Sequence, residues 1–142
     1  MYDDKNLIHF FTILEAIEKI NFYTEDFQDD EDFYFANKQM NFNAVVNLLI
    51  AIGEENKKID EIIKSDYPFT WNDISRMRDK ISHNYRGIDQ YMVWDIIQNS
   101  LKEYKQILIK ITPNIKDFKN ALDEVLNSKY YIHLAYLKQT NF

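Results

Sequence analysis

Turn-forming residues are scarce in this chain, which has only two glycines (Gly53 and Gly87) and two prolines (Pro68 and Pro113) among 142 residues. Both types are used far more often in an average protein, at roughly 7% and 5% of positions. An all-β sandwich or a glycine-rich nucleotide-binding α/β fold needs more turns than these residues can supply. Helices joined by short connections are the architecture that remains.

Apolar residues recur at intervals of three and four along most of the chain, which is typical of amphipathic helices. The acidic stretch at residues 21–32 breaks this pattern and indicates a solvated connection or a ragged helix start. The spacing predicts helices over residues 7–20, 35–64, 70–87, 89–112 and 115–126, with Thr70 or Asn72 capping the third, Asp89 capping the fourth, and the aromatic tail at 130–137 able to extend the last.

These elements predict one all-α bundle of four or five helices. With 46% hydrophobic residues, a chain of this length has enough apolar material for a single core. Gly53 falls inside the long predicted helix, where a glycine costs about 1 kcal/mol against alanine. We therefore expect the backbone of another element to pack closely against Gly53.

Composition excludes several classes of function. Because the chain has no cysteine, it has no disulfide scaffold, thiolate zinc site or cysteine nucleophile. The two glycines are too far apart for a phosphate-binding loop, and no carboxylate or histidine set has metal-ligand spacing. We expect neither cofactor nor metal. The net charge of −6 argues against broad attraction to nucleic acid or to an anionic membrane. No apolar run is long enough for a membrane span and no secretory signal is recognisable, so we expect a cytoplasmic protein.

The basic residues are unevenly distributed. All three arginines, Arg76, Arg78 and Arg86, fall within eleven residues, with Lys80 and His83 between them. Arginine suits a bidentate grip on phosphate, so this segment is where a phosphodiester would dock on an otherwise acidic protein. The alternative is a set of surface ion pairs with neighbouring aspartates.

Helical geometry separates the polar residues of this segment. At about 100° per residue, His83 lies nearly opposite the apolar stripe, with Asp79 one turn before it and Arg76 on the same outer face. A carboxylate that orients an exposed histidine beside arginines is the arrangement that proton transfer needs. Arg78 lies about 140° from His83. Either the helix is distorted before Gly87, or two copies of it pack across a two-fold axis.

Other candidate groups have simpler interpretations. We expect structural or incidental roles for His9, in the first helix, and for His133, in the aromatic tail. Glu54 and Glu55 form an acidic pair without a converging third ligand, which favours a helix face or a dimer contact over a metal site.

Residues 78–85 have the pattern R-x(4)-H-x-Y, formed by Arg78, His83 and Tyr85. With the surrounding blocks, this pattern resembles HepT, the HEPN-domain ribonuclease toxin of HepT/MntA toxin–antitoxin pairs. The likeness extends over roughly residues 7–111, and its flanking blocks are Ile52–Glu55, Trp71–Ile74, Tyr85–Asp89 and Val93–Ile96.

The resemblance implies a HEPN-like helical domain over residues 1–112 that forms a homodimer. Residues 113–142 lie beyond the likeness, and we expect them to form a helical extension packed on the same domain, as a capping helix, an enlarged dimer interface or an antitoxin contact. The resemblance also implies a metal-independent endoribonuclease, with tRNA as one candidate substrate. Arg78 and His83 match the catalytic pair, and Asp79 occupies a supporting position that is often Asn in the family. Tyr85 matches the tyrosine that the antitoxin, an MntA-like minimal nucleotidyltransferase, modifies with AMP. Arg76, Lys80 and Arg86 would hold flanking RNA phosphates.

Two other functions stay open at this stage. The chain could be a non-catalytic helical module that binds a nucleotide, RNA or a partner protein, or it could be the antidote of a toxin–antitoxin pair. Tyr85 could simply pack, because it lies on the apolar stripe of its helix. The sequence does not identify the RNA, the bond that is cut or the role of the extension.

Overall fold

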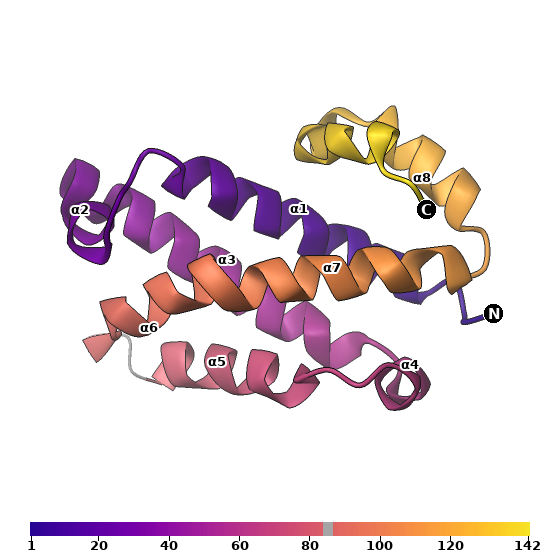
Figure 1. Cartoon of the computed structure of the whole chain (residues 1–142), viewed down its shortest axis with the longest axis horizontal. Helices are drawn as coiled ribbons and strands as arrows, with labels where there is room; N and C mark the ends of the chain where they lie inside the picture. Colours follow the sequence, from indigo (N-terminus) through magenta and orange to yellow (C-terminus); the bar gives the residue numbers. More distant parts are fainter. Residues whose placement is uncertain (84–86) are drawn as a thin grey trace.

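A computed structural model describes residues 1–83 and 87–142, and in these residues the fold is all-α, as the sequence predicts (Figure 1). The one β-type contact among them is a single parallel bridge between Tyr2 and Ile115. The α-helices are α1 (Asn6–Thr24), α2 (Asp30–Phe35), α3 (Met40–Lys58), α4 (Glu61–Asp66), α5 (Trp71–His83), α6 (Gln90–Asp95), α7 (Leu101–Ile111) and α8 (Phe118–Leu126).

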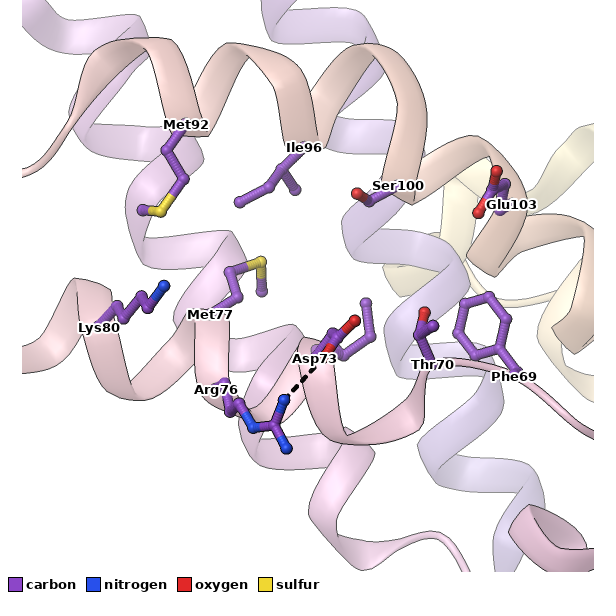
Figure 2. Close-up of a pocket in the computed structure, with 11 residues that line it drawn as sticks. Phe69, Thr70, Asp73, Arg76, Met77, Lys80, Met92, Ile96, Ser100 and Glu103 are labelled. Carbon is purple, nitrogen blue, oxygen red and sulfur yellow. Dashed lines mark hydrogen bonds and ion pairs between the residues drawn. The ribbon is translucent and has the colours of Figure 1, made fainter.

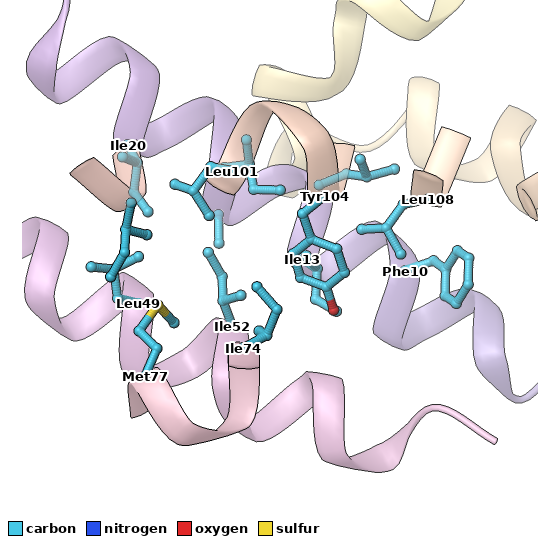
Figure 3. Packing of buried hydrophobic residues seen from close by; sticks show 14 of the residues in the cluster. Phe10, Ile13, Ile20, Leu49, Ile52, Ile74, Met77, Leu101, Tyr104 and Leu108 are labelled. Carbon is cyan, nitrogen blue, oxygen red and sulfur yellow. The ribbon is translucent and has the colours of Figure 1, made fainter. Parts of the chain in front are cut away.

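The helix α3 is the centre of the bundle, because it packs against α1 on one side and α5 on the other. The α6–α7 segment runs across these helices, and α7 also contacts α1. Side chains from all these helices form one apolar core (Figure 3). Its largest fully buried members include Phe10, Phe33, Leu49, Ile52, Ile81 and Tyr104.

The long helix predicted over residues 35–64 was wrong, since two breaks divide it. Asn37, Lys38 and Gln39 have left-handed backbone angles, with φ of 51°, 56° and 70°, within the 3₁₀ turn η1 (Ala36–Gln39). The second break is at Ile59 and Asp60, which are extended.

A contact from α1 accompanies the second break. The Asn6 side chain donates to the Asp60 carboxylate (3.1 Å) and accepts from the Asp60 backbone N–H (3.0 Å). The Asp60 N–H is thereby paired outside any helix, while Ile59 and Ile63 turn into the core. This tertiary contact outweighs the helical periodicity of the local sequence.

The acidic stretch contains a short helix rather than only a solvated connection. The Asp29 carboxylate accepts from the Asp32 N–H at 2.9 Å and caps α2. Three further acidic residues lie in the first turn, where the helix dipole favours negative charge. Phe33 on α2 is fully buried, so this helix anchors the chain between α1 and α3.

The predicted cap at Asp89 is confirmed, because its carboxylate accepts from the N–H groups of Tyr91 (2.9 Å) and Met92 (3.2 Å). The helix that follows runs to Ile111 through a π-helical turn, η3 (Ile96–Ser100), and ends at the 3₁₀ turn η4 (Thr112–Asn114), which contains Pro113. None of the helices in the described residues is long and apolar enough to cross a membrane.

The aromatic tail does not extend α8, although its sequence allowed this. The Ser128 hydroxyl accepts from the Tyr130 N–H and starts a separate 3₁₀ helix, η5 (Lys129–Gln139). Both α8 and η5 lie against α1. Leu134 and Leu137 of η5 are buried in that contact, so residues after Pro113 contribute to the core.

A buried polar network joins α3, α5 and α7. The Asn56 amide donates to the Trp71 carbonyl and to the Ser75 hydroxyl, both at 2.9 Å. Its carbonyl accepts from the Tyr104 hydroxyl at 2.6 Å. Burial raises the pKa of Tyr104 well above its ordinary value, so the phenol stays protonated and remains a donor. One side chain therefore fixes the register of three helices.

Replacing Asn56 should lower the stability of the protein more than the size of its side chain suggests. Asn56→Ala leaves the Tyr104 hydroxyl buried without its acceptor and removes the bonds to the Trp71 carbonyl and the Ser75 hydroxyl. We expect a loss of about 2–4 kcal/mol in the free energy of unfolding. Urea titration followed by circular dichroism measures it. Asn43→Ala, at an exposed position of the same helix, is the control and should change stability by less than about 0.5 kcal/mol. Equal effects of the two substitutions would contradict the network's role.

Candidate functional site

The helix α5 has one apolar face and one polar face, as its sequence predicts. Ile74, Met77 and Ile81 are buried, whereas Ser82 and His83 at its end are exposed. The helix is regular from Trp71 to His83. Asn84, Tyr85 and Arg86 lie outside the described residues, so the predicted modification site Tyr85 and phosphate contact Arg86 have no structural description here.

The side chain of Arg78 on α5 packs directly against the α3 backbone at Gly53. A Cβ atom added to Gly53 would lie 2.1 Å from the Arg78 Cβ and 2.7 Å from its Cγ. Distances this short are impossible, so only glycine lets α5 approach α3 here. The expectation that another element packs closely on Gly53 is confirmed. The partner is the residue that the sequence motif singles out.

Carboxylates hold the guanidinium of Arg78 in place. Its buried Nε lies against the Glu54 carboxylate, and its Nη1 donates to Asp79 at 3.2 Å. The Arg78 side chain is 27% exposed, so it is only partly buried. Nη2 forms no hydrogen bond or ion pair with a described residue, and a guanidinium N–H group is a suitable donor to an oxyanion.

Asp79 faces α3 rather than standing alone beside His83. Its carboxylate accepts from the Lys57 ammonium at 3.0 Å as well as from Arg78. The Lys57 hydrogen bond, and after it the one from Arg78, lowers the pKa of Asp79 below its ordinary value. Asp79 is therefore a fixed negative charge at neutral pH. It steadies Arg78 and has no proton to give.

Arg76 and Lys80 lie on another side of α5. Arg76 is 70% exposed and pairs with Asp73 at 3.1 Å, one of the ion pairs that the alternative interpretation of the arginine cluster anticipates. Both cations line a pocket of about 280 Å³ between α5 and the α6–α7 segment (Figure 2).

The regular course of α5 bears on how Arg78 and His83 could act together. Arg78 is turned toward α3, and His83 lies five residues further along an undistorted helix. No distortion between the two positions turns them toward one atom. The described part of α5, up to His83, therefore does not bring Arg78 and His83 of one chain together.

The other acid and histidine candidates have structural partners. His9 Nδ1 lies 2.6 Å from the Glu55 carboxylate, and Lys58 pairs with the same group at 3.3 Å. His133 contacts the ring of Phe22. No group of three His, Cys, Asp or Glu residues that could hold a metal ion occurs in the part of the chain that the structure describes.

Sequence reasoning did not assign Glu54 and Lys57 to the site. Both contribute from α3, where they contact Arg78 and Asp79. Gly53 was the available signal, because a glycine inside a helix marks a close approach and the residues beside it face whatever approaches.

Comparison with known proteins assigns the family. The family model described as "Ribonuclease HepT-like" matches residues 13–111. This segment contains α3, α5 and the whole R-x(4)-H-x-Y pattern. The chain therefore belongs to the HepT-like ribonuclease family, as its motif indicated.

Individual relatives agree. "Putative RNase MJ0127" of Methanocaldococcus jannaschii is 34% identical over 103 residues, which cover 69% of this chain and 83% of the relative. "Putative RNase MJ1216" of the same organism is 34% identical over 75% of this chain and 86% of the relative. "Probable ribonuclease HepT" of Thermococcus cleftensis is 34% identical over 66% and 83%. No solved structure matches the chain.

The close approach at Gly53 predicts an unusual response to alanine. Gly53→Ala gains about 1 kcal/mol of helix propensity, but it forces α3 and α5 apart at Arg78 and should lower the free energy of unfolding by a net of about 1–2 kcal/mol. Thermal and urea unfolding measure the change. Gly87→Ala is the matched control, because a Cβ there meets nothing within 4 Å, and it should be neutral within about 0.5 kcal/mol. A stabilised Gly53→Ala protein would refute the contact.

Proposed function

We propose that this chain is an endoribonuclease that cuts RNA without a metal ion, using Arg78 and His83. The observation that carries the proposal is the anchoring of Arg78. Glycine opens the space for it, Glu54 and Asp79 hold its guanidinium, and its Nη2 forms no hydrogen bond or ion pair with a described residue. An arginine that is held in one place by two carboxylates and is still partly exposed is better suited to binding an oxyanion than to stabilising the fold alone.

The chemistry needs only groups that these side chains supply. The 2′-hydroxyl of a ribose attacks the adjacent phosphorus, the bond from phosphorus to the 5′-oxygen breaks, and the products end in a 2′,3′-cyclic phosphate and a 5′-hydroxyl. The imidazole of His83 can take the proton of the 2′-hydroxyl and pass a proton to the leaving 5′-oxygen, so the protons balance across the step. Arg78 stabilises the charge that builds up on the phosphoryl oxygens.

A homodimer completes the site in this proposal. Arg78 faces α3 and His83 is exposed further along α5, so a two-fold axis near the end of α5 can place His83 of one protomer beside Arg78 of the other. Exposed Arg76, together with Lys80 and Arg86, would hold the flanking phosphates. These local contacts are what an acidic chain needs to retain RNA.

The proposal extends to a toxin–antitoxin setting. The family assignment and Tyr85, two residues after His83, support silencing by an MntA-like nucleotidyltransferase that transfers AMP to the Tyr85 hydroxyl. The added phosphate and adenine would block the approach of RNA by charge and bulk. The competing function is a helical module that binds RNA, a nucleotide or a partner without cleavage.

Cleavage of total RNA in EDTA separates these functions. Wild type should cut, whereas Arg78→Ala and His83→Ala should lose at least about 10²-fold in rate while retaining their helicity. His133→Ala, which removes a histidine far along the chain, is the control and should keep full activity. His83→Ala should still bind RNA, because it loses turnover rather than affinity. Cleavage that EDTA abolishes, or that survives in His83→Ala, would contradict the proposal.

Transfer of AMP to Tyr85 is tested by measuring the intact mass of the protein after incubation with an MntA-like nucleotidyltransferase and ATP. Wild type should gain AMP and lose ribonuclease activity, and Tyr85→Phe should gain nothing because it lacks the acceptor hydroxyl. Tyr91→Phe removes an exposed tyrosine from α6 and should be modified like wild type. AMP on Tyr85→Phe would place the acceptor elsewhere and overturn this part of the proposal.

A further inference from the structure

The pocket beside α5 has an apolar interior and a polar rim. Met77 and Ile96 are buried in its floor, and Met92 is half-buried opposite them. Figure 2 shows Met77 on α5 and Met92 on α6 facing each other across the pocket, with Phe69 at the far end. Its volume of about 280 Å³ is at the lower end of ligand sites. That size suits one flat ring system with its sugar.

Charged groups surround this interior. Arg76 and Lys80 lie on the α5 side, and Ser100 and Glu103 lie on the α7 side (Figure 2). Asp73 is engaged by Arg76. The Glu103 carboxylate, in contrast, contacts no described residue through a hydrogen bond or ion pair, so its acceptor oxygens are available to a ligand.

The pocket leads toward the proposed catalytic histidine. Asp73, Arg76 and Lys80 occur at i, i+3 and i+7 on α5, and His83 continues this row at i+10. Residues at these intervals share one face of a helix. His83 therefore lies one turn, about 5 Å, beyond the Lys80 end of the pocket. A nucleotide seated in the pocket would bring its phosphate to that end.

We propose that this pocket binds the base of a nucleotide next to the scissile phosphate, with preference for a base that carries an exocyclic amine. The inference rests on the proposed function and adds a recognition site to it. Thioether and aliphatic side chains pack on the faces of a flat ring. The amine would donate to the Glu103 carboxylate, and Arg76 and Lys80 would hold the phosphate.

The preference follows from the sign of the hydrogen bond. Cytosine presents an amino group at C4, whereas uracil presents a carbonyl oxygen there. A carboxylate accepts from the first and repels the second. Because the pocket is open to solvent at its rim, we expect discrimination of about tenfold in Kd, the effect of a single well-formed hydrogen bond to a charged group.

The four methionines of the chain provide an internal test by NMR of [¹³C-methyl]methionine protein. Met77 and Met92 line the pocket, while Met1 and Met40 are exposed elsewhere. Addition of 3′-CMP should shift the methyl signals of Met77 and Met92 and leave those of Met1 and Met40 unchanged. Titration with 3′-UMP should give about tenfold weaker binding at the same signals, and ribose 5-phosphate alone should shift neither pocket signal.

Three variants make the test specific. Glu103→Gln offers both a donor and an acceptor, so it should bind 3′-CMP and 3′-UMP within about twofold of each other. Glu25→Gln, at an exposed site on the end of α1, should keep the wild-type discrimination. Met92→Trp fills the pocket and should abolish the Met77 shift.

Absence of shifts at Met77 and Met92, equal shifts at all four methionines, or equal affinity for the two nucleotides would overturn the proposal. The titration needs no cleavage, and repeating it on His83→Ala keeps it independent of turnover. A protein that binds 3′-CMP in the pocket but cuts no RNA would contradict the proposed function only. A protein that cuts RNA but shows no pocket shifts would contradict this inference only.

Discussion

The approach of α5 to α3 at Gly53 is the contact on which the rest of this structure depends. With no side chain at Gly53, the stem of Arg78 fits directly over the α3 backbone. Asn56, nearly one turn further along α3, then reaches the Trp71 carbonyl at the start of α5 and the Tyr104 hydroxyl on α7. One short stretch of α3 therefore sets both the packing of three helices and the position of the motif arginine. A substitution in this stretch affects stability and function together.

Electrostatics at the site are local rather than global. The chain carries a net charge of −6, yet the segment from Arg76 to His83 gathers basic residues along one helix. Carboxylates accompany them. Glu54 and Asp79 hold Arg78, and Asp73 holds Arg76. Such pairing fixes where each cation points at the cost of some attraction for phosphate. A fixed position matters more than net attraction for a group that, in the proposed function, meets one phosphoryl oxygen.

The sequence was sufficient for the fold class, for the apolar face of α5, for the exposure of His83 and for the cap at Asp89, because each depends on periodicity or on chemistry within one turn of helix. Sequence reasoning failed where contacts between residues far apart in the sequence determine the structure. The Asn6 side chain accepts a hydrogen bond from the Asp60 backbone at the break after α3. The sequence around Asp60 gives no sign of this partner. Residues 37–39 adopt left-handed backbone angles although none of them is a glycine, so the sequence did not indicate the break before α3. The contacts of Glu54 and Lys57 with Arg78 and Asp79 depend on the packing of α3 against α5, which the sequence pattern does not give.

In the proposed function, Arg78 of one protomer and His83 of its partner form one active site, and mixing two inactive variants tests this most directly. Arg78→Ala and His83→Ala proteins are combined, allowed to exchange subunits, and assayed on RNA in EDTA. A shared site predicts recovery of about a quarter of wild-type activity, because half of the dimers are mixed and each mixed dimer has one intact site. A mixture that stays inactive after exchange is verified by mass would contradict the shared site.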